Sequence, residues 1–316
     1  MMKQFTCFKF KELNKDDLIK VLFNEDNIFK EFSSTQQLET SGFVDFHNDY
    51  QVLDTNNVVA LKYKIEKKNV PTSYVKEKLK EKVKELEAKE SRKLAKKEVK
   101  EIKEGIIEEV LARAFTSVSY MITYIDFNKK IIYFDNKSDK KIDKVQRKIA
   151  ESFLGYNPKR FMTKEPFSST IYGYLSKDWF NSDENQSELN LDSKCVLVLP
   201  NDATIQFKNL NLLSEDVMYH LNEDKKNTRF ISQIGLTMGD NVSFSVNENM
   251  QFSNIHIENI QKKKDDDVEQ TDKQFDESNL IIEINAMNDI VFKIVDILGG
   301  ESESMNDSID AESNAE

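Results

Sequence analysis

Residues 71–115 read PTSYVKEKLKEKVKELEAKESRKLAKKEVKEIKEGIIEEVLARAF, a stretch dominated by Lys and Glu on which the interpretation of the whole chain depends. Its apolar residues recur at spacings of three or four and form two groups: Val75, Leu79, Val83 and Leu86, then Ala95, Val99, Ile102, Ile106 and Val110. Such spacing places a narrow apolar stripe along one side of a helix. The residues Pro71, Thr72 and Ser73 are typical of a helix start. We therefore predict a helical arm over 71–115.

A polar break between Lys89 and Lys97 separates the two groups and offers little apolar surface to bury. Two arrangements fit this pattern. In the first, a single helix of roughly 60 Å, at 1.5 Å per residue, leaves the globular body for about two turns. In the second, two helices fold back on each other as a hairpin near Lys96. Both arrangements extend the segment away from the body.

The charge of this arm is the reverse of the charge of the chain. From Tyr74 to Lys103 there are twelve cations and seven anions, a net +5, in a protein of net charge −11. One interpretation is a solvated helix in which Glu and Lys support each other four residues apart. The other is a basic surface that lies along a nucleic-acid backbone. In that case the phosphate-binding candidates on the arm are Lys76, Lys80, Lys84, Lys89, Arg92, Lys93, Lys96, Lys97 and Lys100.

The acidic total does not argue against such a partner. Residues 265–316 carry sixteen acidic residues and two lysines, a net −14, which leaves +3 on the other 264 residues of a chain whose total is −11. The chain has no apolar run of the roughly 18 residues needed to span a membrane, and no uninterrupted signal-peptide core near the N-terminus. Cys7 and Cys195 lie in strand-like apolar surroundings, which predicts buried free thiols and a cytoplasmic protein.

The rest of the 316-residue chain alternates strand and helix patterns and predicts an α+β fold with two sheet-containing domains. The first domain is expected over 1–165 and includes the arm, with a helix over 15–32 and a hairpin that turns at 128–130. The second is expected over 166–300, with a charged linker over 261–277 and a final strand and helix over 280–298. Residues 301–316 have the composition of a disordered acidic tail.

No catalytic constellation is evident in the sequence. His47, His220 and His256 are scattered without the spacing of metal ligands, and neither a phosphate-binding glycine loop nor a nucleophile elbow is present. Three consecutive aspartates at 265–267 fall in the expected linker, where a metal site would be poorly held. We therefore predict no metal, no cofactor and no enzymatic activity.

Four segments together resemble a known family in the same order along most of the chain. They are KIEKKNVPTSYVKEKLKEKV (64–83), ELEAKESRKLAKKEVKEIKEGIIEEVLARAF (85–115), FKNLNLLSEDV (207–217) and INAMNDIVFKIVDILGGESES (284–304). The family is that of the bacterial recombination-associated protein RdgC, which has a Lys-rich helical region with a Pro before it and an Arg-Ala-Phe turn after it.

The resemblance implies a ring-forming homodimer with a positively lined hole that encircles double-stranded DNA. It also implies binding without sequence preference, extending to single-stranded DNA, antagonism of RecA-mediated recombination and a nucleoid-associated location. By position, Phe115 matches a phenylalanine that seats in the partner subunit, and Lys208 falls in a segment that supplies a hole-lining lysine. The family carries more positive charge there than Lys208 and Asn209 provide. The alternative for Phe115 is an ordinary core residue at a helix-to-strand junction.

Two other functions compete with this interpretation. A DNA-processing nuclease could also carry a DNA-tracking arm. A helical scaffold could use the arm as a coiled-coil partner without DNA, although the broken apolar stripe lacks the sustained heptads that a coiled coil requires.

Overall fold

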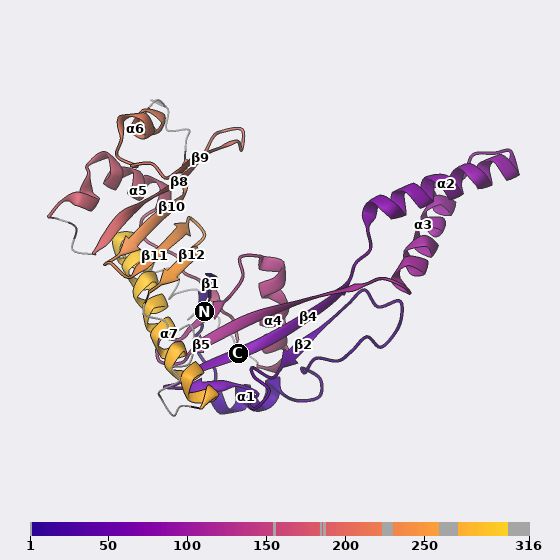
Figure 1. Cartoon of the computed structure of the whole chain (residues 1–316), viewed down its shortest axis with the longest axis horizontal. Coiled ribbons are helices and arrows are strands. Elements are labelled where there is room, and N and C mark those ends of the chain that lie inside the picture. Colours follow the sequence, from indigo (N-terminus) through magenta and orange to yellow (C-terminus); the bar gives the residue numbers. More distant parts are fainter. Residues whose placement is uncertain are drawn as a thin grey trace, which may run out of the picture.

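A computed structural model describes residues 2–153, 156–183, 185, 188–222, 230–258 and 271–302. The fold is α+β, as predicted, and is built on one large antiparallel sheet (Figure 1). In spatial order the main path of the sheet is β2 (Glu39–Val44), β4 (Val58–Lys68), β5 (Thr116–Asp126), β6 (Ile131–Phe134), β1 (Gln4–Lys9), β12 (Gln251–Ile257), β11 (Val242–Asn247), β10 (Phe230–Met238), β8 (Leu189–Val198) and β9 (Thr204–Lys208). Off this path, β3 (Leu53–Thr55) pairs with β4, and β7 (Lys159–Arg160) pairs with β1.

The first strand joins the two halves of the chain. In the pairing of β1 with β12, Phe5 lies opposite Phe252, and the two rings stack with centroids 4.6 Å apart. On its other edge β1 pairs with β6, where Cys7 lies opposite Tyr133. The sheet therefore runs without interruption from the N-terminal part of the chain into the C-terminal part. The division into domains at residue 165 stays a prediction.

Successive residues of a strand point to opposite faces of the sheet, and each face has its own core. One core contains residues of β1, β3–β6 and β8–β12 together with α5 (Phe167–Ser176), the short helix η1 (Trp179–Asn181) and the long helix α7 (Asp272–Ile297). The other core contains residues of β1 and β4–β6 together with α1 (Lys15–Leu22) and α4 (Asp139–Ser152). Both predicted buried thiols, Cys7 and Cys195, belong to the first core and are free.

A helical hairpin interrupts the connection between β4 and β5. These two strands pair along their full length, from Val58 opposite Asp126 to Lys68 opposite Thr116, and form a ribbon that extends away from the rest of the sheet (Figure 1). At the end of this ribbon α2 (Thr72–Glu90) and α3 (Lys96–Leu111) fold back on each other. Ser91, in the left-handed conformation, ends α2, so the hairpin alternative holds and the turn lies at 91–95, just before Lys96.

Three sequence predictions are wrong in detail. The strand expected near residue 280 is part of α7, because Leu280, Ile284 and Met287 are buried at helical spacing on one face. That helix begins after Thr271, whose side chain accepts from the Gln274 amide, so the expected linker is helical from 272 onward; residues 259–270 lie outside the described residues. The helix expected over 15–32 ends at Leu22, because the Asn24 side chain accepts from two following amides and turns the chain.

Only two residues of the expected acidic tail are described. The Glu301 backbone forms an isolated β-bridge with Thr163, and its side chain forms an ion pair with Lys9 at 2.5 Å. Residues 303–316 lie outside the described residues. Among the helices that the structure describes, none has the length and apolar character that crossing a membrane requires.

Candidate nucleic-acid interface

The hairpin holds together through the apolar stripe that its sequence predicts. Val75 on α2 and Ile106 on α3 are buried, and Leu79, Val83, Ile102 and Val110 are partly buried between the helices. The stripe is narrow, so the remaining surface of both helices is exposed to solvent. The lysines and glutamates occupy that surface.

Arg92 is committed to the turn of the hairpin. Its guanidinium donates to both carboxylate oxygens of Glu98, at 2.9 and 2.6 Å, and also lies 2.6 Å from Glu90. The Glu98 carboxylate also accepts from the backbone amide of Ala95 at 2.7 Å. These contacts, Arg92 first, lower the pKa of Glu98 to about 2. Arg92 therefore fixes the turn geometry, and two carboxylates offset its charge.

The other predicted phosphate-binding residues of the hairpin divide into two groups. Lys89 pairs with Glu85 at 2.6 Å, and Lys100 pairs with Glu104 at 3.6 Å, each four residues apart on one helix. Such exposed pairs contribute little to stability, because water screens both charges. Six others are exposed and form no ion pair with any residue that the structure describes: Lys76, Lys80, Lys84, Lys93, Lys96 and Lys97. We call these the six free lysines.

Phe115 follows the hairpin and lies in solvent. Its side chain is 89% exposed, so the alternative of an ordinary core residue is wrong for the single chain. Its backbone is fixed, because the Asn69 amide donates to the Phe115 carbonyl at 2.8 Å where the two chain segments enter and leave the hairpin. Tyr74, Val118 and Tyr120 are also exposed, at 46, 47 and 54%. We call these four side chains the root patch.

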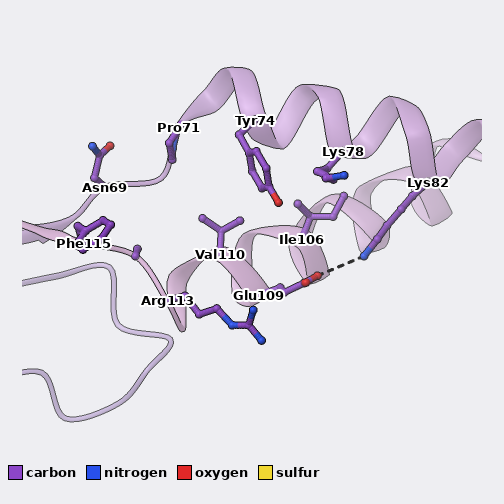
Figure 2. Close-up of a pocket in the computed structure, with 11 residues that line it drawn as sticks. Asn69, Pro71, Tyr74, Lys78, Lys82, Ile106, Glu109, Val110, Arg113 and Phe115 are labelled. Atoms are coloured by element: carbon purple, nitrogen blue, oxygen red, sulfur yellow. Dashed lines mark hydrogen bonds and ion pairs between the residues drawn. The ribbon is translucent and has the colours of Figure 1, made fainter.

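A pocket of about 550 Å³ opens between the bases of α2 and α3, and Tyr74 and Phe115 of the root patch are among the residues that line it (Figure 2). Its apolar wall includes Tyr74, Ile106 and Val110. Lys82 and Glu109, 3.5 Å apart, form an ion pair at its far side. A concave apolar site beside an exposed phenylalanine is typical of a protein–protein contact.

Sequence patterns do not reveal the other three members of the root patch. Val118 and Tyr120 read as ordinary residues of a half-buried strand, because β-branched and aromatic residues favour strands. They are exposed because the first half of β5 belongs to the ribbon, beyond the helices that cover the sheet; burial begins at Met121. No local pattern in the sequence marks where a strand leaves the body.

Lys208 lies far from the hairpin within one chain. It ends β9, the edge strand of the sheet, and Figure 1 shows β9 and the hairpin at two separate ends of an open shape. Lys208 is exposed and lies directly opposite Lys194 of β8. The structure therefore brings the hairpin lysines together on one element and places Lys208 at a second one.

The described residues contain no group of three or more His, Cys, Asp and Glu side chains arranged to hold a metal ion. His47 lies 3.5 Å from Asp49 and stacks on Tyr50, and His220 lies against the Phe207 ring. These are structural contacts. The aspartates at 265–267 lie outside the described residues.

Comparison with known proteins gives one consistent result. Residues 1–301 match the family model described as "Putative exonuclease, RdgC". Several curated proteins named "Recombination-associated protein RdgC" are also similar. The protein of Proteus mirabilis is 24% identical over 242 residues, 75% of this chain and 77% of that protein. That of Actinobacillus succinogenes is 27% identical over 240 residues, 75 and 76% of the two chains, and that of Colwellia psychrerythraea is 24% identical over 266 residues, 83% of each.

Proposed function

Because the family model matches residues 1–301, this chain belongs to the RdgC family, and we propose that it is a DNA-binding protein whose dimer closes as a ring around duplex DNA. The family resemblance seen in the sequence is thus confirmed, and the similar curated proteins are recombination-associated. DNA binding, the ring and the effect on recombination are the parts that we propose.

The observation that carries the proposal is the combination of two surfaces on one projecting element. The hairpin presents six free lysines, and its root presents Phe115 beside an apolar pocket. Lysines on a rigid helical scaffold bind phosphates electrostatically, and phosphate contacts carry no sequence information. The hairpin therefore suits binding that depends on the DNA backbone and ignores the base sequence.

The root patch supplies the contact between subunits. In a twofold symmetric dimer the same surface is used on both copies. Phe115 of one subunit therefore enters the pocket between the bases of α2 and α3 of the other, and the contact is reciprocal. This contact would bury an aromatic side chain that is 89% exposed in the single chain. Each subunit has an open shape with the hairpin at one end (Figure 1). In the proposed ring two such subunits meet at both ends of this shape, and the free lysines face the space that they enclose.

A closed ring on duplex DNA also accounts for an effect on recombination. It occupies phosphates that a RecA filament or its duplex partner would otherwise use. Antagonism of RecA-mediated strand exchange then follows from occupancy of the DNA, and a direct contact with RecA is not required.

A salt series tests DNA binding, and a comparison of closed circular with linear DNA tests the ring. Binding to duplex should weaken steeply with salt, with a log–log slope of about −0.9 for each phosphate contacted, and to the same extent for unrelated sequences. Complexes on closed circles should resist competitor DNA longer than complexes on the same DNA made linear. A flat salt response would refute phosphate binding, and equal lifetimes on circles and linear DNA would refute the ring.

The description of the family model makes an exonuclease the second candidate. An exonuclease shortens linear DNA and spares closed circles, whereas a binding ring leaves both intact. Incubation of uniformly labelled linear and closed circular DNA with Mg²⁺ or Mn²⁺ separates the two functions. Release of labelled nucleotides from linear DNA alone would establish the exonuclease.

A further inference from the structure

One face of the sheet formed by β8–β12 carries no helical cover in the described part of the chain. Helices α5 and α7 pack on the opposite face, where their apolar residues join the first core. The open face is set by the strand register, because directly paired residues point to the same side. Four paired residues form a row across this face, one from each of β9, β8, β10 and β11. In spatial order they are Gln206, Val196, Gln233 and Asn247.

Amide side chains extend this row to the edge of α4. The Asn247 amide donates to Gln251 of β12 at 3.0 Å, and the Gln251 amide donates to the Lys137 carbonyl at 3.0 Å. Lys137 itself is exposed, just before α4. Apart from Val196, this row of side chains is thus polar from the free edge at β9 to the residues just before α4.

Three lysines converge on this face. Lys194 of β8 and Lys208 of β9 are directly opposite each other, which places their Cβ atoms about 4.5–5.5 Å apart. The stem of Lys194 lies against Gly235, where an added Cβ would be 3.2 Å from the Lys194 Cβ. Burial, and then repulsion from Lys208 and Lys137, lower the pKa of Lys194, and Asp192 offsets this only in part.

These lysines lack the partners that would make their arrangement favourable. Like charges directly opposite on neighbouring strands destabilise a sheet. Lys137, Lys194 and Lys208 form no ion pair with any residue described by the structure, although Glu–Lys pairs are common elsewhere on this protein. A phosphate between the three ammonium groups would replace their mutual repulsion with attraction, and amide side chains on the same face can donate hydrogen bonds to its oxygens.

We propose that the open face of β8–β12 is a second phosphate-binding surface, on which Lys137, Lys194 and Lys208 bind the backbone of the same duplex that the hairpin contacts. This inference rests on the proposed function and deepens it. The resemblance pointed to Lys208 alone; the register and the convergence of charge add Lys194 and Lys137. Lys194 on β8 and Lys137 just before α4 then supply positive charge that residues 208–209 lack.

The test uses the full-length protein and a duplex of about 30 base pairs, with affinity measured by fluorescence anisotropy across a KCl series. Lys194→Gln and Lys137→Gln are each expected to reduce the magnitude of the log–log slope by about 1, with weaker binding to every sequence. Lys194→Arg keeps the charge and should keep the slope. Lys177→Gln is the matched control, because this exposed lysine follows α5, which packs on the other face.

The outcomes separate this inference from the proposed function. If the unmutated protein binds duplex with a flat salt response, the proposed function fails. If its slope is steep but Lys194→Gln and Lys137→Gln match Lys177→Gln, only the second surface is refuted. Thermal unfolding of each variant excludes a folding defect, and loss of slope in Lys194→Arg as well as in Lys194→Gln would also refute the role of charge.

Discussion

Replacing Phe115 with alanine is expected to weaken the contact between two subunits and leave the protomer stable. The Phe115 side chain is 89% exposed in the single chain, so its loss removes little folded-state packing. Surface substitutions of this kind usually change the free energy of unfolding by no more than about 0.5 kcal/mol. At concentrations where both proteins are monomers, the unfolding midpoint should therefore stay within a few degrees of that of the unmutated protein.

The effect on the interface is much larger. Burying a phenylalanine side chain contributes about 2–3 kcal/mol, at roughly 25 cal/mol for each Å² of apolar surface. A twofold contact contains two copies of Phe115, so the substitution should cost the interface about 5 kcal/mol. That cost corresponds to a dissociation constant raised by roughly three to four powers of ten.

The assay combines two readouts. Sedimentation over a dilution series gives the dissociation constant of the dimer, and competitor challenge gives the lifetime on closed circular DNA, which should fall to the lifetime on linear DNA. Met162→Ala is a suitable control, because Met162 is 55% exposed and lies outside the hairpin. An unchanged dimer with an unchanged lifetime on circles would refute the assignment of Phe115 to the subunit contact.

Three further predictions follow from charges in the structure. Changing Lys93, Lys96 and Lys97 together to Gln should reduce the salt slope by up to about 2.7, equally for unrelated sequences; a loss confined to one sequence would contradict backbone binding. Because the pKa of Glu98 is lowered to about 2, its stabilising contacts are complete above its ordinary pKa near 4.5 and are lost as the pH falls toward 2. Glu98→Gln should therefore speed amide hydrogen exchange at 91–95 already at neutral pH, and unchanged exchange would show that the turn does not need this carboxylate. Burial and then the charge of Glu283 raise the pKa of Asp135 to about 6, so ionisation destabilises the protein as the pH rises from about 4 to 6. Asp135→Asn should stabilise it at pH 7.5 by about 1 kcal/mol after allowance for partial exposure, with no gain near pH 4, as measured by denaturant unfolding at both pH values.

Local patterns predict most of the elements of this fold. The alternation of Val59, Leu61, Tyr63 and Ile65 indicates a strand with one buried face, and all four side chains are buried within β4. The turn at 128–130 is confirmed, with Lys130 in the left-handed conformation between β5 and β6. These features depend on neighbours in sequence, so periodicity and turn chemistry are enough to find them.

Long-range features are the part that the sequence does not reveal. The pairing of β1 with β12 brings Phe5 beside Phe252, and nothing local to either strand specifies that partner. The alternation in residues 281–284, Ile-Ile-Glu-Ile, resembles a strand, but those residues continue a helix of 26 residues because α7 packs along the sheet. Tertiary packing overrides local preference in such short apolar runs.

The candidate site also combines local features that the sequence predicts with long-range features that it does not. The excess of lysine in 74–103 is evident from the sequence, but the sequence does not show which lysines are paired. The structure assigns Arg92, Lys89 and Lys100 to carboxylate partners and leaves six lysines free. Likewise, the sequence leaves Phe115 open between a subunit contact and an ordinary core residue, and the structure excludes the core alternative by exposing its side chain just before β5.

The most direct test of DNA encirclement is a gel-shift series on one DNA sequence prepared as linear duplex, closed circle and single strand, each across a range of salt. We predict affinity for the duplex that falls steeply with salt and is independent of sequence, together with complexes on closed circles that survive competitor and salt concentrations that strip the linear form. Equal stability on circular and linear DNA, or binding that is insensitive to salt, would contradict the proposal that this protein encircles DNA by its phosphate backbone.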